Sequence, residues 1–227
     1  AGRTRRFKLS SRACQRTLGD LTLMRQQHIH DTDRVVAVQH QATVFQGAIW
    51  DIQRDTFTMT DTDQPLTREY ITHPGAVAIV AVDDQQRIAM INQYRHPVGQ
   101  DCWEIPAGLL DVEGESHLVT AQRELAEEAD LQAADWSVLV DHYPSAGSSA
   151  EAIRIFLAQG IEELPTDQHH QREAEEAHLI LRWIPFDQAL HAVLTGAIRN
   201  VNAISGILAA HLVLNGQHQA RPAEAPF

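Results

Sequence analysis

Cysteine is scarce in this sequence, and long apolar runs are absent. Cys14 and Cys102 are the only cysteines among 227 residues, so neither a disulfide framework nor a cysteine-based zinc site is indicated. No stretch approaches the roughly 20 apolar residues of a membrane helix, and the first residues lack the apolar region of a secretory signal. We therefore expect a soluble cytoplasmic protein with two reduced thiols.

Basic residues are few outside the first 30 positions. That stretch carries seven Arg or Lys residues against Asp20 alone, which leaves 11 basic and 29 acidic residues for the rest. An acidic body repels nucleic acid and suits a protein that holds divalent cations. Residues 1–32 contain few apolar side chains to bury, so we expect a flexible basic tail. Contact between this tail and phosphates is the alternative.

Two regions with different periodicity follow the tail. Residues 33–73 alternate in the manner of strands, at positions 35–38, 41–50, 55–59 and from 67 onward. The turn cluster Asp61–Pro65 closes a hairpin. We expect a small amino-terminal antiparallel β subdomain.

Residues 74–215 mix apolar strands with helical periods. The run Ala76–Val82 and its successor Arg87–Tyr94 predict a buried hairpin, because the turn between them is short. A helix is predicted over 116–131, followed by strands at 136–140, 153–158 and 179–184 and helices at 186–194 and 201–214. This mixture predicts a sheet sandwiched by helices, with residues 216–227 as a frayed carboxy-terminal tail.

The helix over 116–131 carries an acidic face. Glu124, Glu127 and Glu128 lie within an arc of roughly 100°, and Leu118, Ala121, Leu125 and Ala129 form a separate apolar stripe. Mg²⁺ relieves the repulsion of such carboxylates, because it prefers hard oxygen ligands. A solvated acidic face is the alternative. The strand and glycine turn predicted before the helix favour the metal, since Gly108 permits close backbone approach.

Gly108, Glu115 and Arg123–Glu128 resemble the Nudix box. Its pattern is a glycine, a glutamate, and then Arg-Glu-aliphatic-X-Glu-Glu-X-Gly-aliphatic, and the seven residues between Glu115 and Arg123 fit it. In this chain Glu115 lies one residue further from Gly108, and Asp130 stands at the late glycine. Aspartate is one of the few side chains that tolerate the left-handed backbone common at a helix end.

The resemblance implies a Nudix-type α/β/α sandwich with a mixed sheet, and Mg²⁺-dependent hydrolysis of a pyrophosphate bond with Mn²⁺ as a substitute. The implied metal ligands are Glu124, Glu127, Glu128 and the Ala107 carbonyl, and Arg123 braces the glutamates. The ions would neutralise the phosphates and lower the pKa of a bridging water.

A carboxylate from a later loop often deprotonates the water in this subfamily. Glu176 is our first candidate and Glu173 our second, because Glu176 lies nearest the following strand. A solvated acidic loop is the alternative.

Residues 47–214 resemble bacterial ADP-ribose pyrophosphatases, through the segments Thr67–Glu69, Gly75–Val80, Gln93–His96 and Trp103–Gly108. The implied reaction yields AMP and ribose 5-phosphate from ADP-ribose. Arg95 would contact the diphosphate or terminal ribose, and Trp50 would stack on adenine unless it is a core residue. The other implied substrate contacts are Gly108, Leu109 and, across a subunit boundary, Arg68 and Glu69.

One loop departs from the resemblance. The family has a Pro-Gly-Phe-Ser-Asp-Glu-like loop, and here residues 144–151 place Ala146 at the proline, Ser148 at the aromatic and Ala150 at the acid. Another nucleoside diphosphate sugar, or a dinucleotide such as NADH, therefore remains open as the substrate.

The resemblance also implies a homodimer, because the amino-terminal strands of such enzymes pair across subunits. A non-catalytic Nudix-like sensor of ADP-ribose, with its tail on DNA, is the alternative from another class. The intact glutamates and the lack of a helix-turn-helix argue against it, so we expect no nucleic-acid partner.

Overall fold

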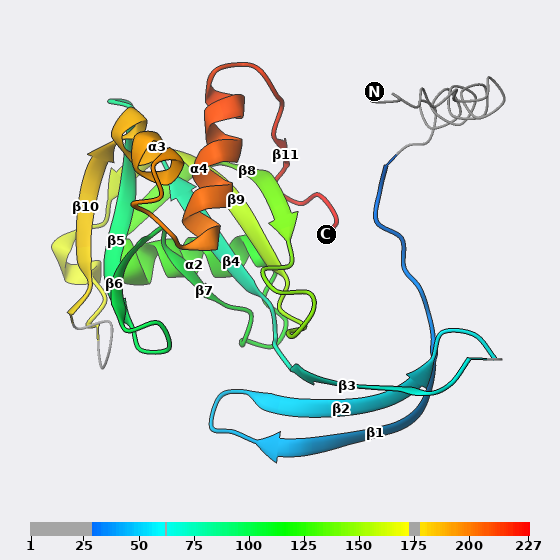
Figure 1. Ribbon diagram of the computed structural model, residues 1–227. Helices are drawn as coiled ribbons and strands as arrows, with labels where there is room; N and C mark the ends of the chain where they lie inside the picture. Colours follow the sequence, from blue (N-terminus) through cyan, green and yellow to red (C-terminus); the bar gives the residue numbers. More distant parts are fainter. Residues whose placement is uncertain (1–28, 62, 173–177) are drawn as a thin grey trace, which may run out of the picture.

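The computed structural model describes residues 29–61, 63–172 and 178–227 (Figure 1). Its elements are, in chain order, β1 (Ala37–Gln46), β2 (Asp51–Thr58), β3 (Leu66–Ile71), β4 (Ala76–Ala81), β5 (Arg87–Arg95), β6 (Gln100–Glu104), β7 (Ala107–Leu109), α2 (His117–Ala129), β8 (Leu131–His142), β9 (Ile153–Glu163), η1 (Thr166–Gln168), β10 (Ile180–Pro185), α3 (Phe186–Leu194), α4 (Val201–Leu214) and β11 (Arg221–Pro222).

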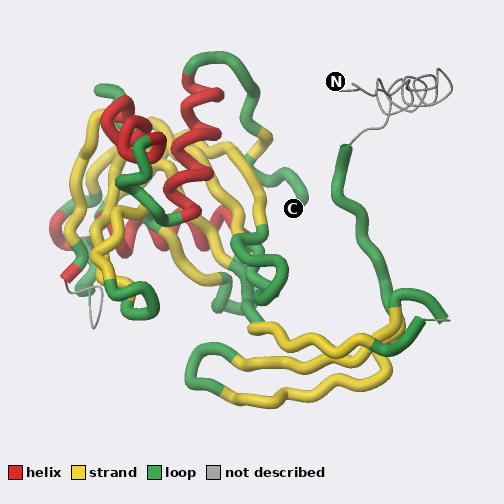
Figure 2. Tube along the Cα trace, in the orientation of Figure 1, coloured by secondary structure: helices red, strands yellow, loops and turns green. Residues whose placement is uncertain are grey.

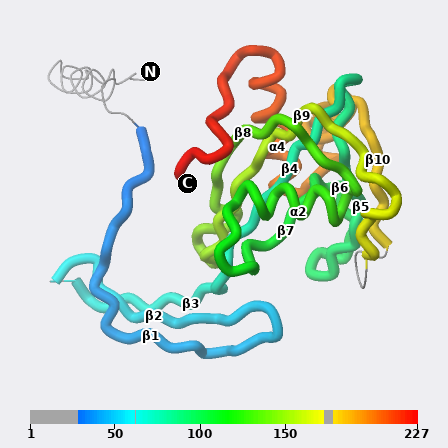
Figure 3. Tube along the Cα trace, turned by 180° about the vertical axis from the view of Figure 1, so that it is seen from behind, coloured from blue at the N-terminus to red at the C-terminus, as the bar shows by residue number. Residues whose placement is uncertain are grey.

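Two sheets form the centre of the main body. The larger has the strand order β11-β8-β9-β4-β7 and is mixed, since β4 and β9 run parallel while its other neighbours are antiparallel. The smaller is antiparallel, with the order β10-β5-β6. Helix α2 covers one face, and α3 with α4 covers the other (Figures 1 and 3). The α/β/α sandwich with a mixed sheet is therefore confirmed.

The prediction of a hairpin between Ala76–Val82 and Arg87–Tyr94 is wrong. Strand β4 pairs with β7 and β9, whereas β5 pairs with β6 and β10. A single bridge, Val82 to Ile88, joins the end of β4 to the start of β5. Every residue of β4 is buried, because apolar cores lie on both of its faces. A uniformly apolar run identifies such a strand, but it does not indicate the strand's partner.

The amino-terminal strands form a separate antiparallel sheet in the order β1-β2-β3, as expected (Figure 2). The predicted boundaries are wrong in two places. A single strand spans 37–46 where we expected 35–38 and 41–50, and β2 begins at Asp51 instead of residue 55, after residues 47–50 turn the chain. The Gly47 amide donates to the Trp50 carbonyl at 3.1 Å in that turn. Trp50 therefore lies outside the strands.

Helix α2 has the predicted amphipathic arrangement. Ala121, Leu125 and Ala129 are buried on one stripe, where they pack against the sheets. The Ser116 hydroxyl caps the first turn by accepting from the Val119 amide at 3.3 Å, which satisfies a donor that has no partner within the helix. No helix in the part of the chain that the structure describes is long and apolar enough to span a membrane.

The carboxy-terminal end is not frayed, contrary to expectation. Strand β11 pairs with β8, and Arg154 donates to the Ala225 carbonyl at 2.6 Å. Arg154 is 3% exposed and pairs with both oxygens of Asp141 at 2.8 and 2.9 Å, while Arg221 reaches Asp141 at 2.9 Å. A buried arginine that needs hydrogen-bond acceptors therefore holds the end of the chain in place.

Replacement of Asp141 by asparagine will destabilise this end by about 3 kcal/mol at pH 7, because it leaves the buried Arg154 without a counter-charge. Burial alone would raise the pKa of Asp141, but the hydrogen bonds and charges of Arg154 and Arg221 outweigh it and hold the pKa below its usual 3.8. The stabilisation is therefore present at neutral pH and disappears as the pH falls through that lowered pKa. Urea unfolding of the wild type and the variant over a pH series from neutral to strongly acidic will measure it. The more exposed Arg221→Gln is the control, with an expected cost below about 1 kcal/mol; an equal cost for both variants would contradict this account.

Candidate active site

The carboxylates of α2 meet the backbone of β7. Glu128 Oε2 accepts a hydrogen bond from the Ala107 amide at 2.8 Å, and Glu128 and Glu124 are only 5% and 9% exposed. Residue Gly108 lies within β7, opposite Val77 of β4, and not in a turn as we expected. The sheet therefore fixes the backbone against which the helix presents its glutamates.

Gly108 leaves the space that Glu124 occupies. A Cβ added at Gly108 would lie 1.9 Å from Glu124 Cδ and 2.1 and 2.3 Å from its two carboxylate oxygens. Non-bonded carbon atoms approach no closer than about 3.5 Å without repulsion. The glycine of the motif is thus required for close approach of the helix carboxylate to the strand, not for a left-handed backbone.

Arg123 holds three glutamates together. Its Nη1 donates to Glu124 at 2.6 Å and to Glu127 at 3.0 Å, and its Nε donates to Glu115 at 3.3 Å. Burial alone would lower the pKa of Arg123, but the charge of Glu124 and the contacts with Glu127 and Glu115 raise it. The guanidinium therefore stays charged and braces the carboxylates.

Glu124 lies where a negative charge is unfavourable. Burial is the main cause that raises the pKa of its carboxyl group, and the charges of Glu127 and Asp111 add to that effect, while Arg123 opposes it. A cation near these oxygens would relieve this cost.

The oxygen atoms at this site are of the chemical type that a hard divalent cation binds. Three glutamates and a neighbouring backbone carbonyl at Ala107 are oxygen donors of the kind that Mg²⁺ takes. Within residues 29–61, 63–172 and 178–227, no three His, Cys, Asp or Glu side chains are already arranged to hold a metal ion. Arg123 explains this, because it already engages Glu124 and Glu127.

Arg95 is fixed beside these carboxylates by a residue that the sequence reasoning did not assign. Its Nε and Nη2 donate to the two oxygens of Glu104 at 3.0 and 2.7 Å, and the Glu104 side chain is 4% exposed. The pair borders a cavity of about 410 Å³ that Arg199 also lines. Glu104 lies in the segment Trp103–Gly108, one of those that carried the family resemblance. That resemblance was the signal in the sequence that could have identified Glu104. Leu109, at the end of β7, is partly buried against the core.

Trp50 stacks on His73, with ring centroids 4.5 Å apart and planes at 16°. The Gly75 amide donates to His73 Nδ1 at 3.0 Å, and His73 Nε2 lies 3.4 Å from Glu151. The loop before Glu151 is in turn paired with the end of β3, since the Ile71 amide donates to the Ser148 carbonyl at 2.9 Å. The loop that departs from the family pattern is therefore joined to Trp50 through His73.

The remaining expected site residues lie apart from this cluster or outside the described residues. Glu69 pairs with Arg54 at 2.8 Å, and Arg68 donates to the Thr67 carbonyl at 2.8 Å, so the contacts of both belong to the amino-terminal sheet. Glu173 and Glu176 lie outside the residues that the structure describes.

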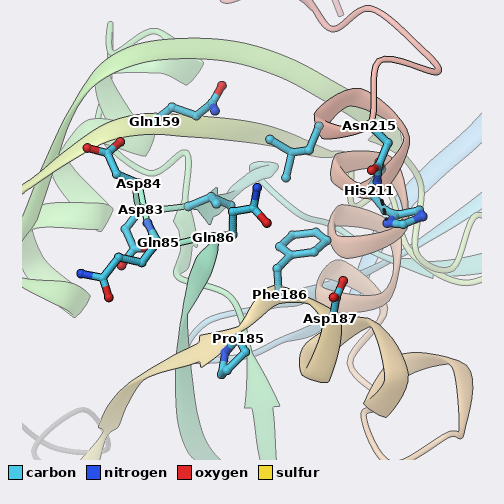
Figure 4. Close-up of a pocket in the computed structure, with 12 residues that line it drawn as sticks. Asp83, Asp84, Gln85, Gln86, Gln159, Pro185, Phe186, Asp187, His211 and Asn215 are labelled. Atoms are coloured by element: carbon cyan, nitrogen blue, oxygen red, sulfur yellow. Dashed lines mark hydrogen bonds between the residues drawn. The ribbon is translucent and has the colours of Figure 1, made fainter.

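A different cavity, of about 580 Å³, opens between the turn that follows β4 and the end of α4 (Figure 4). Asp83 and Gln86 line one side, and His211 and Asn215 line the other. None of the α2 glutamates contributes to its lining. We therefore place the candidate active site at α2 and β7.

The chain is similar to known proteins over most of its length. The NUDIX domain model matches residues 72–203. The chain is 46% identical over 185 residues to an ADP-ribose pyrophosphatase of Mycobacterium tuberculosis, covering 82% of this chain and 87% of the relative. It is 34% identical over 137 residues to an ADP-ribose pyrophosphatase of Bacillus subtilis, covering 60% and 71%. The crystal structure of an ADP compounds hydrolase shares the fold, with a TM-score of 0.68 at 17% identity, covering 84% of this chain and all of that one.

The chain belongs to the Nudix family, since the domain model matches more than half of the chain and the matched residues include α2. Within the family it is a Nudix hydrolase similar to the ADP-ribose pyrophosphatases. Members of this family typically use a divalent metal, and the carboxylates of α2 are oxygen donors of the kind that such a metal takes.

Proposed function

We propose that the protein hydrolyses the pyrophosphate bond of ADP-ribose to AMP and ribose 5-phosphate, with Mg²⁺ as its metal and Mn²⁺ as a substitute. The observation that carries the proposal is the convergence of Glu124 and Glu128 on Ala107–Gly108. The 46% identity to an ADP-ribose pyrophosphatase over most of both chains supports the substrate.

Glu124, Glu127, Glu128 and the Ala107 carbonyl would hold the metal. When bound, it supplies charge neutralisation for the diphosphate and lowers the pKa of water. Arg123 holds Glu124 and Glu127 close together through its hydrogen bonds to both, and the metal would share these carboxylates with the guanidinium group.

Arg95 would bind the diphosphate or the terminal ribose. Its pairing with Glu104 uses Nε and Nη2 and so fixes the plane of the guanidinium group, while Nη1 remains to meet a phosphate oxygen. Gly108 and Leu109 would line the substrate site. A water positioned at the phosphorus would lose its proton to Glu176 or, as the second choice, to Glu173.

The test is release of AMP and ribose 5-phosphate from ADP-ribose in the presence of Mg²⁺, followed by chromatography. We expect turnover with ADP-ribose to exceed that with other diphosphates. Faster turnover of another nucleoside diphosphate sugar or of NADH would change the substrate and keep the reaction. No turnover of any diphosphate would support an ADP-ribose sensor instead.

A homodimer would complete the site. The amino-terminal sheet exposes apolar side chains on and beside β1, among them Val38, Val44, Phe45 and Ile49 at 50%, 42%, 59% and 73%. Exposed apolar groups on a sheet are typical of a contact surface. A second copy there would bring Arg68 and Glu69 to the neighbouring nucleotide, and Trp50 would stack on adenine. A monomer at micromolar concentration in analytical ultracentrifugation would refute this arrangement.

A further inference from the structure

Helix α2 ends at a residue that the family pattern does not have. Asp130 follows α2 in the left-handed conformation, with φ 54° and ψ 36°, where the Nudix box has glycine. Among the described residues only Gln86 shares a positive φ without being glycine. Side chains are disfavoured in this conformation, so a compensating contact of the Asp130 side chain is expected.

That contact comes from the loop after β9. Arg172 Nη2 donates to Asp130 Oδ2, and the His170 amide donates to Asp130 Oδ1 at 3.3 Å. The Leu164 amide donates to the Asp130 carbonyl at 2.9 Å. A glycine at position 130 could accept the last of these bonds but neither of the first two.

Arg172 also binds the helix itself. Its Nε donates to the Glu127 carbonyl at 3.1 Å. This carbonyl is one of the last four of the helix, to which no amide within the helix donates. One guanidinium therefore spans the main chain at Glu127 and the side chain of Asp130. Glu128 lies between these two anchored positions. Both members of the ion pair are about one-fifth exposed, at 22% and 19%, so the pair is partly shielded from solvent.

We propose that Asp130 and Arg172 are positioning residues that fix the last turn of α2, and with it Glu127 and Glu128, in the orientation that binds the metal. The inference rests on the proposed function, because it assigns those glutamates to the metal. Partners that orient metal ligands typically change metal affinity or activity by about 10–100-fold when they are removed.

Asp130→Gly and Arg172→Gln test the proposal. Glycine suits the left-handed backbone, so Asp130→Gly removes only the side-chain contacts. For both variants we expect kcat to fall about tenfold, KM to change less than twofold, and the Mg²⁺ concentration for half-maximal rate to rise. The loss in the double variant should be smaller than the product of the two single losses, because either change alone breaks the shared ion pair. Each residue also has one contact of its own, so the double variant should lose somewhat more than either single variant. Arg87→Gln is the matched control, since it removes the partly exposed ion pair with Asp83 at the turn after β4 and should keep wild-type kinetics.

Two further measurements make the outcome independent of the substrate. In metal-free protein, amide hydrogen exchange in the last turn of α2 should accelerate in both variants, and calorimetry should show weaker Mg²⁺ binding. Wild-type kcat and Mg²⁺ dependence in both variants, or losses that multiply in the double variant, would overturn the proposal. An inactive wild type would defeat the proposed function instead, and exchange and Mg²⁺ binding would still decide the role of the pair.

Discussion

Glu128→Gln will reduce kcat for diphosphate hydrolysis on the order of 10³-fold while the protein remains folded. The carboxylate is 5% exposed and accepts from the Ala107 amide at 2.8 Å. A glutamine oxygen can accept the same bond, so the contact between α2 and β7 survives. The negative charge does not survive, and under the proposed function its loss weakens the hold on a metal whose charge accounts for several kcal/mol of transition-state stabilisation, with tenfold in rate for about 1.4 kcal/mol.

The control for Glu128→Gln is the same substitution at a glutamate whose charge should have little effect on the rate. Glu162 of β9 accepts from the Gln132 side chain at 3.0 Å on the surface, and Glu162→Gln should retain the wild-type rate. Initial rates over a Mg²⁺ series, together with thermal unfolding of all three proteins, will separate loss of chemistry from loss of fold. A Glu128→Gln variant within tenfold of wild type would remove Glu128 from the metal site.

Local sequence signals placed the helices well. The apolar stripe located α2 to within two residues at each end, and the predicted bounds of α3 and α4 agree with the structure. These signals act between residues three or four positions apart, so the sequence alone contains them.

Long-range pairing could not be predicted in the same way. The apolar run of β4 has no side chain that favours β9 over β5 as its neighbour. The carboxy-terminal residues are held by Arg154, which is 71 positions from the Ala225 carbonyl that it binds. Tertiary contacts of this kind decide strand order and chain ends, and periodicity does not report them.

The candidate site shows the same difference between local signals and long-range contacts. The motif made Glu124 and Glu128 candidates, because their spacing on one helix is local. The partner of Arg95 was missed, because the β5–β6 pairing places Gln100 opposite Arg95 and only the folded arrangement of the side chains brings Glu104 to it. Asp130 was noted as a departure from the pattern, but its compensating Arg172 lies 42 positions away.

Gly108→Ala will separate activity from stability. The added methyl group would fall 1.9–2.3 Å from the Glu124 carboxylate, which is the flexible end of its side chain and can rotate away. Alanine also restricts the unfolded chain, an effect worth about 0.4–1 kcal/mol, so we expect the free energy of unfolding to change by less than about 1 kcal/mol. Glu124 can no longer occupy its place against β7, and misplacement of a catalytic group by about 1 Å can cost roughly 10²-fold in rate.

We expect the opposite result for Gly206→Ala, which should lower stability and leave activity unchanged. Its methyl group would meet Val80 at 2.8 Å and Ile105 at 3.1 Å in the core under α4. Overpacking costs roughly 1–3 kcal/mol, against about 1 kcal/mol gained in helix propensity, so we expect a net loss of about 1 kcal/mol and an unchanged kcat. Denaturant unfolding and initial rates on both variants will measure the contrast. If Gly108→Ala keeps its kcat, the close approach of Glu124 to β7 has no catalytic role, because the methyl group and the present carboxylate position cannot coexist.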